Sequence, residues 1–226
     1  MKKIFSAAAV LLMTVLFAQS QNNTTLSPAD IKIQQTIEFL NQQGATGNNQ
    51  AALRLLMDPE QDCENAIPVC QSTYVQTTSY SGGGFVDDLD PNNTCLLTGE
   101  TNSVWYIFTV QNPGELTFTI QTSFDYDYAL YNITGLDCDI IPALTPVRCN
   151  YSADNGNTGL VLPAQSGNIT YGASDPAFMP AVFVNTGQTY ALLVNNWTGD
   201  NTGYTLSFSG SSTIVDHGRK PVATVA

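Results

Sequence analysis

The chain has 226 residues, of which 43 % are hydrophobic and 12 % are charged, with 19 acidic residues against 7 basic ones. A net charge of −12 repels phosphate backbones and argues against a nucleic-acid partner. The acidity fits divalent cation binding, although solubility outside the cell is the simpler explanation.

The first twenty residues have the order of a secretory signal peptide. Lys2 and Lys3 precede an apolar run from Ala7 to Phe17, and Ala18-Gln19-Ser20 then supplies small residues for cleavage. The run is shorter than the roughly 18 residues that a membrane-spanning helix needs. We therefore expect an exported chain without a membrane span.

A helical leader is predicted over residues 21–60. Ser27 can cap a helix over residues 27–43 with helix-like apolar spacing, and a second short helix is predicted over residues 49–57. The break at Asp58-Pro59-Glu60 is a candidate domain boundary.

Short strands between turns are predicted for residues 61–215, and residues 216–226 are expected to form a tail or linker. Val104–Val110 and Glu115–Ile120 flank the turn Gln111–Gly114, which predicts a hairpin with one buried face. The other predicted strands are Tyr126–Ile133, Val182–Val184, Thr189–Asn195 and Tyr204–Ser209. Asn150–Gly172 is expected to form loops, with at most a short strand near Ile169. The pattern predicts a mainly β fold, an antiparallel jelly-roll-like β-sandwich preceded by a short helical segment.

Five cysteines in an exported chain predict two disulfides and one spare thiol. Cys138 and Cys149 are expected to pair, because they flank one proline-containing loop. The sequence does not choose a pairing among Cys63, Cys70 and Cys95.

Asp125 and Asp127 are two residues apart, so in a strand their side chains lie on one face. Two neighbouring carboxylates repel unless a cation or a donor compensates them. Calcium, which takes six to eight oxygen ligands, would suit the pair if Glu100 and Asp175 approached it. The alternative is a turn in which Asp125 accepts backbone hydrogen bonds and Asp127 is solvated.

Two tryptophans differ in their expected exposure. Trp105 lies in a strongly apolar strand and is expected in the core, whereas Trp197 begins a turn and is the better candidate for an exposed ring that binds a sugar. Packing within the core or a loop remains the alternative for Trp197.

Catalysis is not expected. A Ser-His-Asp triad would need His217, the only histidine, which lies in the predicted tail. A glycosidase would need Glu100 to face Asp125 or Asp127 across a cleft, and nothing in the sequence indicates that separation.

Several segments resemble the N-terminal domain of gliding-motility-associated, adhesion-like surface proteins of Bacteroidota. The segments that carry the resemblance are Cys63–Ala66, Gly99–Phe108, Asp125–Tyr131 and Arg148–Ser152. The run from Asn92 to Trp105, together with Pro113–Phe118 and Asp127-Tyr128, is also similar to CUB-like and prepeptidase-C-terminal-like sandwiches. The resemblance implies type IX secretion, display at the cell surface and calcium binding, with Asp127 at a ligand-like position. Such proteins usually continue for many repeats, whereas this sequence stops at Ala226.

Together these observations predict a secreted, non-catalytic recognition or adhesion module for an extracellular glycan or protein surface. Calcium is the one cofactor expected. The alternatives are an accessory domain of a secreted hydrolase, in which Glu100 and Asp127 would converge, and a purely structural spacer domain.

Overall fold

The computed structural model describes residues 59–215 of the chain. The predicted signal peptide, the predicted leader helices, His217 and the predicted tail lie outside the described residues. Two 3₁₀ helices, η1 (Pro59–Gln61) and η2 (Cys63–Asn65), open the described part, and a third, η3 (Cys138–Ala143), follows the middle strands. Among the residues described, no helix is long and apolar enough to cross a membrane.

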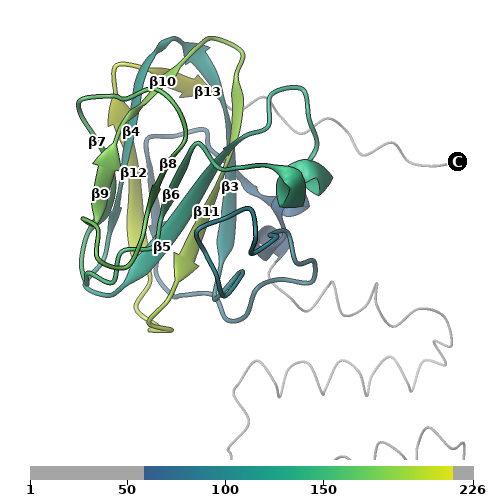
Figure 1. Ribbon diagram of the computed structural model, residues 1–226, viewed down its shortest axis with the longest axis vertical. Coiled ribbons are helices and arrows are strands. Elements are labelled where there is room, and N and C mark those ends of the chain that lie inside the picture. The colour runs from purple at the N-terminus through teal and green to yellow at the C-terminus, as the bar shows by residue number, and fades with distance from the viewer. Residues whose placement is uncertain (1–58, 216–226) are drawn as a thin grey trace, which may run out of the picture. The chain divides into compact units, whose positions relative to one another are not determined.

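Within residues 59–215, thirteen strands form two sheets that pack face to face (Figure 1). The first sheet has the order β1-β3-β11-β5-β6-β8, and β13 also pairs with β3. Its strands are β1 (Ile67–Pro68), β3 (Val104–Asn112), β5 (Tyr126–Asn132), β6 (Arg148–Asn150), β8 (Ile169–Tyr171), β11 (Thr189–Asn196) and β13 (Thr213–Val215). The second sheet has the order β2-β12-β4-β7-β9, and β10 also pairs with β4. Its strands are β2 (Thr73–Gln76), β4 (Gly114–Gln121), β7 (Thr158–Val161), β9 (Phe178–Pro180), β10 (Val182–Val184) and β12 (Tyr204–Gly210).

The predicted β-sandwich is confirmed, but the predicted hairpin is wrong. Strands β3 and β4 follow each other around Pro113, yet β3 pairs with β1, β11 and β13 while β4 pairs with β7, β10 and β12. The chain therefore crosses from one sheet to the other at this turn. Period-two alternation predicts that each strand buries one face. Two consecutive strands can bury such faces either by pairing in one sheet or by lying in two stacked sheets, so the pattern does not distinguish the two arrangements.

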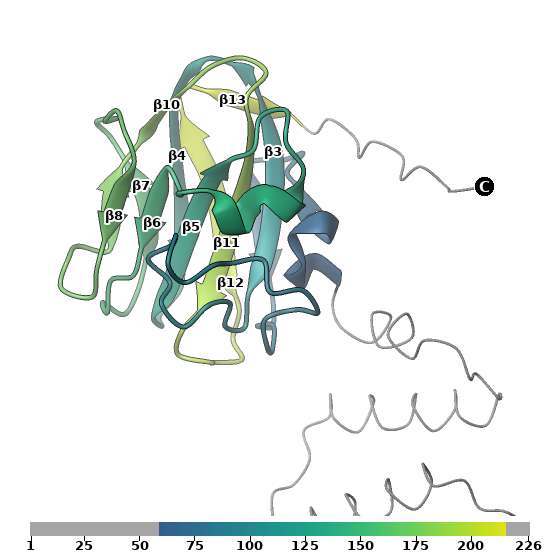
Figure 2. The same cartoon turned by 45° about the vertical axis from the view of Figure 1, so that its right-hand side comes forward.

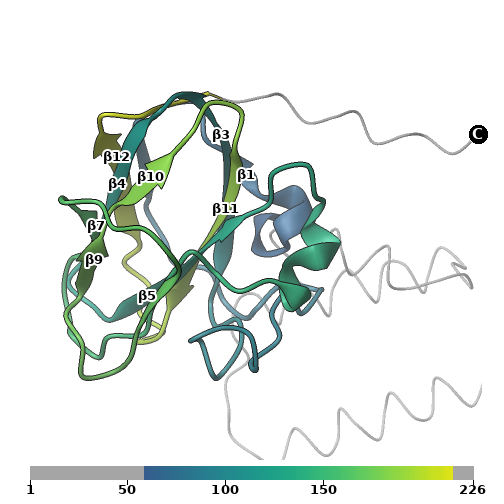
Figure 3. The same ribbon diagram turned by 45° about the horizontal axis from the view of Figure 1, so that its top comes forward.

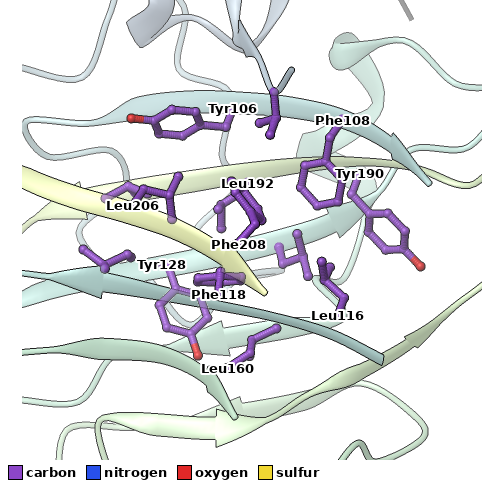
Figure 4. Close-up of a cluster of buried hydrophobic side chains, with 14 of the residues drawn as sticks. Tyr106, Phe108, Leu116, Phe118, Tyr128, Leu160, Tyr190, Leu192, Leu206 and Phe208 are labelled. Atoms are coloured by element: carbon purple, nitrogen blue, oxygen red, sulfur yellow. The ribbon is translucent and has the colours of Figure 1, made fainter. Parts of the chain in front are cut away.

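The main core lies between the sheets, where inward-facing residues of both interdigitate. Figure 4 shows Tyr106, Phe108 and Leu192 of the first sheet facing Phe118 and Phe208 of the second. The rings of Phe108 and Phe208 are 5.3 Å apart at 67°, an edge-to-face arrangement that aromatic pairs favour.

A second core covers the outer face of the first sheet. Loops and 3₁₀ helices lie over β3, β11 and β5 on the side away from the second sheet, as Figures 2 and 3 show. The buried residues of this cluster include Leu96, Trp105, Tyr131, Ile141 and Leu193. Because the first sheet is covered on both faces, β3 is buried almost continuously rather than on alternate residues.

Two disulfides tie this cover to the sheet. Cys63 pairs with Cys138, and Cys95 pairs with Cys149, while Cys70 is free and exposed. The predicted number of bridges is confirmed, and the predicted Cys138–Cys149 pair is wrong. Cys149 lies in β6 with its side chain in the outer core, where it meets the loop carrying Cys95 rather than the start of η3.

Three of the short strands at the sheet edges, β1, β2 and β9, were not predicted from the sequence. The pairs β1–β3, β6–β8 and β7–β9 are parallel, whereas the central pairs are antiparallel. Strand β7 lies in the polar segment that was expected to form loops, and the predicted short strand near Ile169 is confirmed as β8. Gly159 in β7 has a φ of +146° and lies against the backbone of Phe118, so any side chain there would collide with β4.

Candidate functional site

Two of the four carboxylates singled out in the sequence, Asp125 and Asp127, lie at the start of β5, on the covered face of the first sheet. In the sheet order β5 lies between β11 and β6. Asp127 is directly opposite Asn195 of β11, and its same-face neighbours along the strand are Ala129 and Tyr131 of the outer core. Alternation places Asp125 on that face as well.

An aromatic pair lies over this part of β5. Trp197 directly follows β11 and Tyr151 directly follows β6, so the two rings come from opposite sides of β5. Their centroids are nevertheless only 5.7 Å apart at 75°. The rings therefore meet across β5. Trp197 remains 43 % exposed whereas Trp105 is fully buried, which confirms the predicted contrast between them.

Asp127 is a buried carboxyl group without a compensating charge. It is 2 % exposed, and within residues 59–215 no hydrogen bond to its carboxylate is found. Burial, together with the charge of Asp125, raises the pKa of Asp127 to about 8. The alternative in which Asp127 is solvated is therefore wrong.

The hydrogen bonds that fix Asp125 involve its backbone and not its carboxylate. Its N–H donates to Thr198 Oγ1 at 3.0 Å, and its carbonyl accepts from the Thr198 N–H at 3.3 Å. Its side chain is 8 % exposed, and Oδ1 is buried without a hydrogen-bond partner among the residues described. The alternative, a turn in which the Asp125 carboxylate accepts backbone hydrogen bonds, is therefore not found among residues 59–215. Burial and the nearby Asp154 raise the pKa of Asp125.

Glu100 has a different environment, in the cover of the first sheet. Its Oε1 accepts from the Trp105 indole N–H at 2.7 Å, and its Oε2 accepts from the Asp88 N–H at 2.8 Å. Burial raises the pKa of Glu100 to about 8, and the charges that raise it further are those of Asp88 and Asp87 rather than that of Asp127. Glu100 therefore holds the cover loop in place.

Asp175 lies in the turn after β8, where its Oδ2 accepts from the Gly172 N–H at 2.8 Å. The four carboxylates expected to share a cation are not brought together as a set. Over the described range 59–215, no three Asp, Glu, His or Cys side chains are grouped closely enough to hold a metal ion. Only Asp125 and Asp127 of the predicted ligands remain neighbours.

The described part of the chain has a single basic side chain, Arg148. The other basic residues, Lys2, Lys3, Lys32, Arg54, Arg219 and Lys220, lie outside residues 59–215. Arg148 is fully buried in β6, and its guanidinium donates to the carbonyls of Pro180, Val147, Gly167, Gln165 and Ala181. It therefore neutralises none of the carboxylates at the start of β5.

A pocket of about 330 Å³ opens between the sheets at a separate place. Its lining includes Leu116, Phe208 and Ile214 together with the free Cys70. No carboxylate or histidine lines it. It therefore lacks the paired acids that glycoside hydrolysis uses.

Sequence reasoning missed Tyr151 and Thr198, which position the site. Thr198 directly follows Trp197 in the predicted turn, so its position beside the candidate aromatic ring was a signal in the sequence. Its hydrogen bond to Asp125 was not predicted. Tyr151 carried no comparable signal, because its approach to Trp197 depends on β6 and β11 flanking β5.

No protein-family model matches the chain, and neither does any curated protein or solved structure with which it was compared.

Proposed function

We propose that this protein is a secreted, non-catalytic recognition module of the bacterial cell exterior, and that it binds a glycan at the start of β5. One observation carries the proposal: Trp197 is 43 % exposed and is held edge-to-face by Tyr151 beside Asp125. An exposed aromatic ring offers an apolar face to a sugar ring, and neighbouring carboxylates accept hydrogen bonds from its polar groups.

The location outside the cytoplasm is supported by the two disulfides, which persist in oxidising compartments. Export by the type IX route, display at the cell surface and a part in gliding motility or adhesion follow from the resemblance of the sequence.

The proposed absence of catalysis is supported by how the acids are arranged. The hydrolase alternative requires Glu100 to converge with Asp127, but Glu100 uses both oxygens to hold Trp105 and Asp88. Asp127 is buried beside Asp125 instead.

The test is a glycan array probed with the mature chain, followed by titration of the best ligand. Trp197→Ala should weaken binding at least about tenfold, because exposed aromatic anchors dominate such contacts. Phe183→Ala is the matched control, since Phe183 is 55 % exposed on β10 in the second sheet. Equal loss in both variants would contradict the proposed site. A blank array with capture of a protein instead would favour a protein surface as ligand, and no binding at all would favour a spacer domain.

A bound calcium ion could supply the positive charge that Asp125 and Asp127 lack. Neither carboxyl group has a cationic partner among the described residues, which is the reason to test for calcium. A native-state calcium site would raise the unfolding temperature by several degrees over chelator, and Asp127→Ala would abolish the shift. No shift would remove calcium from the proposal and leave recognition at Trp197 intact.

A further inference from the structure

We infer that the ligand of this site carries a protonated amine, and specifically that it is a glycan containing an unsubstituted amino sugar. The inference rests on the proposed function, because it names the ligand class for the same site.

The site has acidic side chains that no basic side chain in the described structure balances, and a bound ammonium would displace the proton that burial keeps on Asp127 below about pH 8. Asp125 Oδ1 is buried without a partner, Asp127 is 2 % exposed without a hydrogen bond, and Asp154 adds a third charge near Asp125. The one basic side chain between residues 59 and 215, Arg148, is bonded to carbonyls elsewhere. An anionic ligand is therefore disfavoured, and a cationic group is favoured.

An ammonium group fits this arrangement better than a metal ion. It needs only three acceptors at hydrogen-bond distance, which Asp125 and Asp127 can share with one further oxygen of the ligand or of water. Calcium needs six to eight oxygen ligands, and no third carboxyl group joins the pair closely enough in residues 59–215.

The aromatic pair adds two further attractions. An ammonium near the faces of Trp197 and Tyr151 gains cation–π stabilisation, and the ring of the same sugar can lie against the exposed indole. Thr198 ties the backbone beside Trp197 to the backbone of Asp125, so the two segments that carry the indole and the carboxylate are held side by side. An amino sugar presents both groups, a ring face and an ammonium, within one residue.

The deciding experiment compares three β-1,4-linked hexasaccharides that differ only at carbon 2. They are the glucosamine hexamer, its fully N-acetylated form and cellohexaose, titrated calorimetrically into the mature chain at about pH 6 and about 150 mM salt to limit general attraction of a polycation. We expect the glucosamine hexamer to bind at least about tenfold more tightly than the other two.

Asp125→Asn should abolish this preference while keeping the shape of the side chain. The control is Asp139→Asn, which removes one charge from the exposed part of η3, and it should preserve the preference. Thermal unfolding of both variants shows whether they remain folded. Equal loss in the two variants would overturn the inference, because it would indicate net-charge attraction alone.

The outcomes distinguish a failure of the amine requirement from a failure of the proposed glycan binding. If all three hexasaccharides bind equally and Trp197→Ala weakens each of them, the amine requirement is wrong and the glycan site stands. If none binds and the glycan array is blank, both fail.

Discussion

The ring of Tyr151 meets the ring of Trp197 above strand β5, with 5.7 Å between their centroids, although the two residues follow strands on opposite sides of β5. This contact lies on the covered face of the first sheet, where burial and then the nearby Asp127 raise the pKa of Tyr151. Asp127 is 2 % exposed, and no hydrogen bond from residues 59–215 reaches its carboxylate. Such an arrangement destabilises the carboxylate and favours whatever neutralises it.

Folding stability should fall as the pH rises from about 5 to about 8. The pKa of Asp127 is about 8 in the folded chain, and an unfolded Asp titrates near about 4. Between these values the folded chain holds a proton that the unfolded chain has released, so the free energy of unfolding decreases with pH. Glu100, with a pKa of about 8, acts in the same direction. Urea unfolding at several pH values measures the slope.

Asp127→Asn should flatten part of this pH dependence, because the amide does not titrate. Asp139→Asn, in the exposed part of η3, should leave the slope unchanged. Stability that increases between about pH 5 and about pH 8, or an unchanged slope in Asp127→Asn, would show that the carboxyl group is compensated in solution.

Arg148→Lys should destabilise the sandwich by at least about 3 kcal/mol, since an ammonium has three donors and cannot satisfy the five carbonyls that the guanidinium contacts. One carbonyl belongs to Val147, directly before β6, and the other four belong to the segment that runs from before β8 to directly after β9, so loss of the contacts should loosen this edge of both sheets. Hydrogen exchange should therefore increase first around Gln165 and Gly167. A decrease in the free energy of unfolding below about 1 kcal/mol would mean that the five hydrogen bonds of Arg148 contribute little to stability.

Digestion under non-reducing conditions should release the peptides that join Cys63 to Cys138 and Cys95 to Cys149. Cys70 should be alkylated without reduction, because it is free and exposed. The double change Cys95→Ser and Cys149→Ser should cost about 2–5 kcal/mol, whereas Cys70→Ser should be nearly neutral. A peptide that joins Cys138 to Cys149 would contradict the pairing.

Glu100→Gln should destabilise the cover of the first sheet by about 1–3 kcal/mol. The amide nitrogen that replaces one oxygen is a donor, and it would face either the Trp105 indole N–H or the Asp88 N–H. The emission of Trp105 in denaturant should then change before the unfolding of the main core. Unchanged stability would show that the two hydrogen bonds are replaced by water at no cost.

Local patterns in the sequence were sufficient to locate the central strands. The predicted bounds of β10 agree with the structure, and those of β5, β11 and β12 differ by one residue at one end. The contrast between Trp105 and Trp197 was also predictable, because each depends on the residues beside it in the chain. Period-two alternation and turn residues are local signals.

Partners distant in the sequence were not predictable in the same way. Alternation indicates that β3 and β4 each have an inward face, but it does not indicate that they belong to different sheets. Cys138 was matched with Cys149 by proximity in sequence, whereas the cover loop brings Cys95 to Cys149 instead. The meeting of Tyr151 with Trp197 depends on the same sheet order, and no local signal encodes it.

Acrylamide quenching of tryptophan fluorescence, with and without a bound glycan, tests the central claim most directly. The chain has two tryptophans, and Trp105 is fully buried while Trp197 is 43 % exposed, so quenching reports mainly on Trp197. If the start of β5 is the binding site, saturating glycan should lower the quenching constant of the wild type, and Trp197→Ala should show weak quenching in either state. Binding that leaves the quenching of Trp197 unchanged would contradict the claim and place the ligand elsewhere on the molecule.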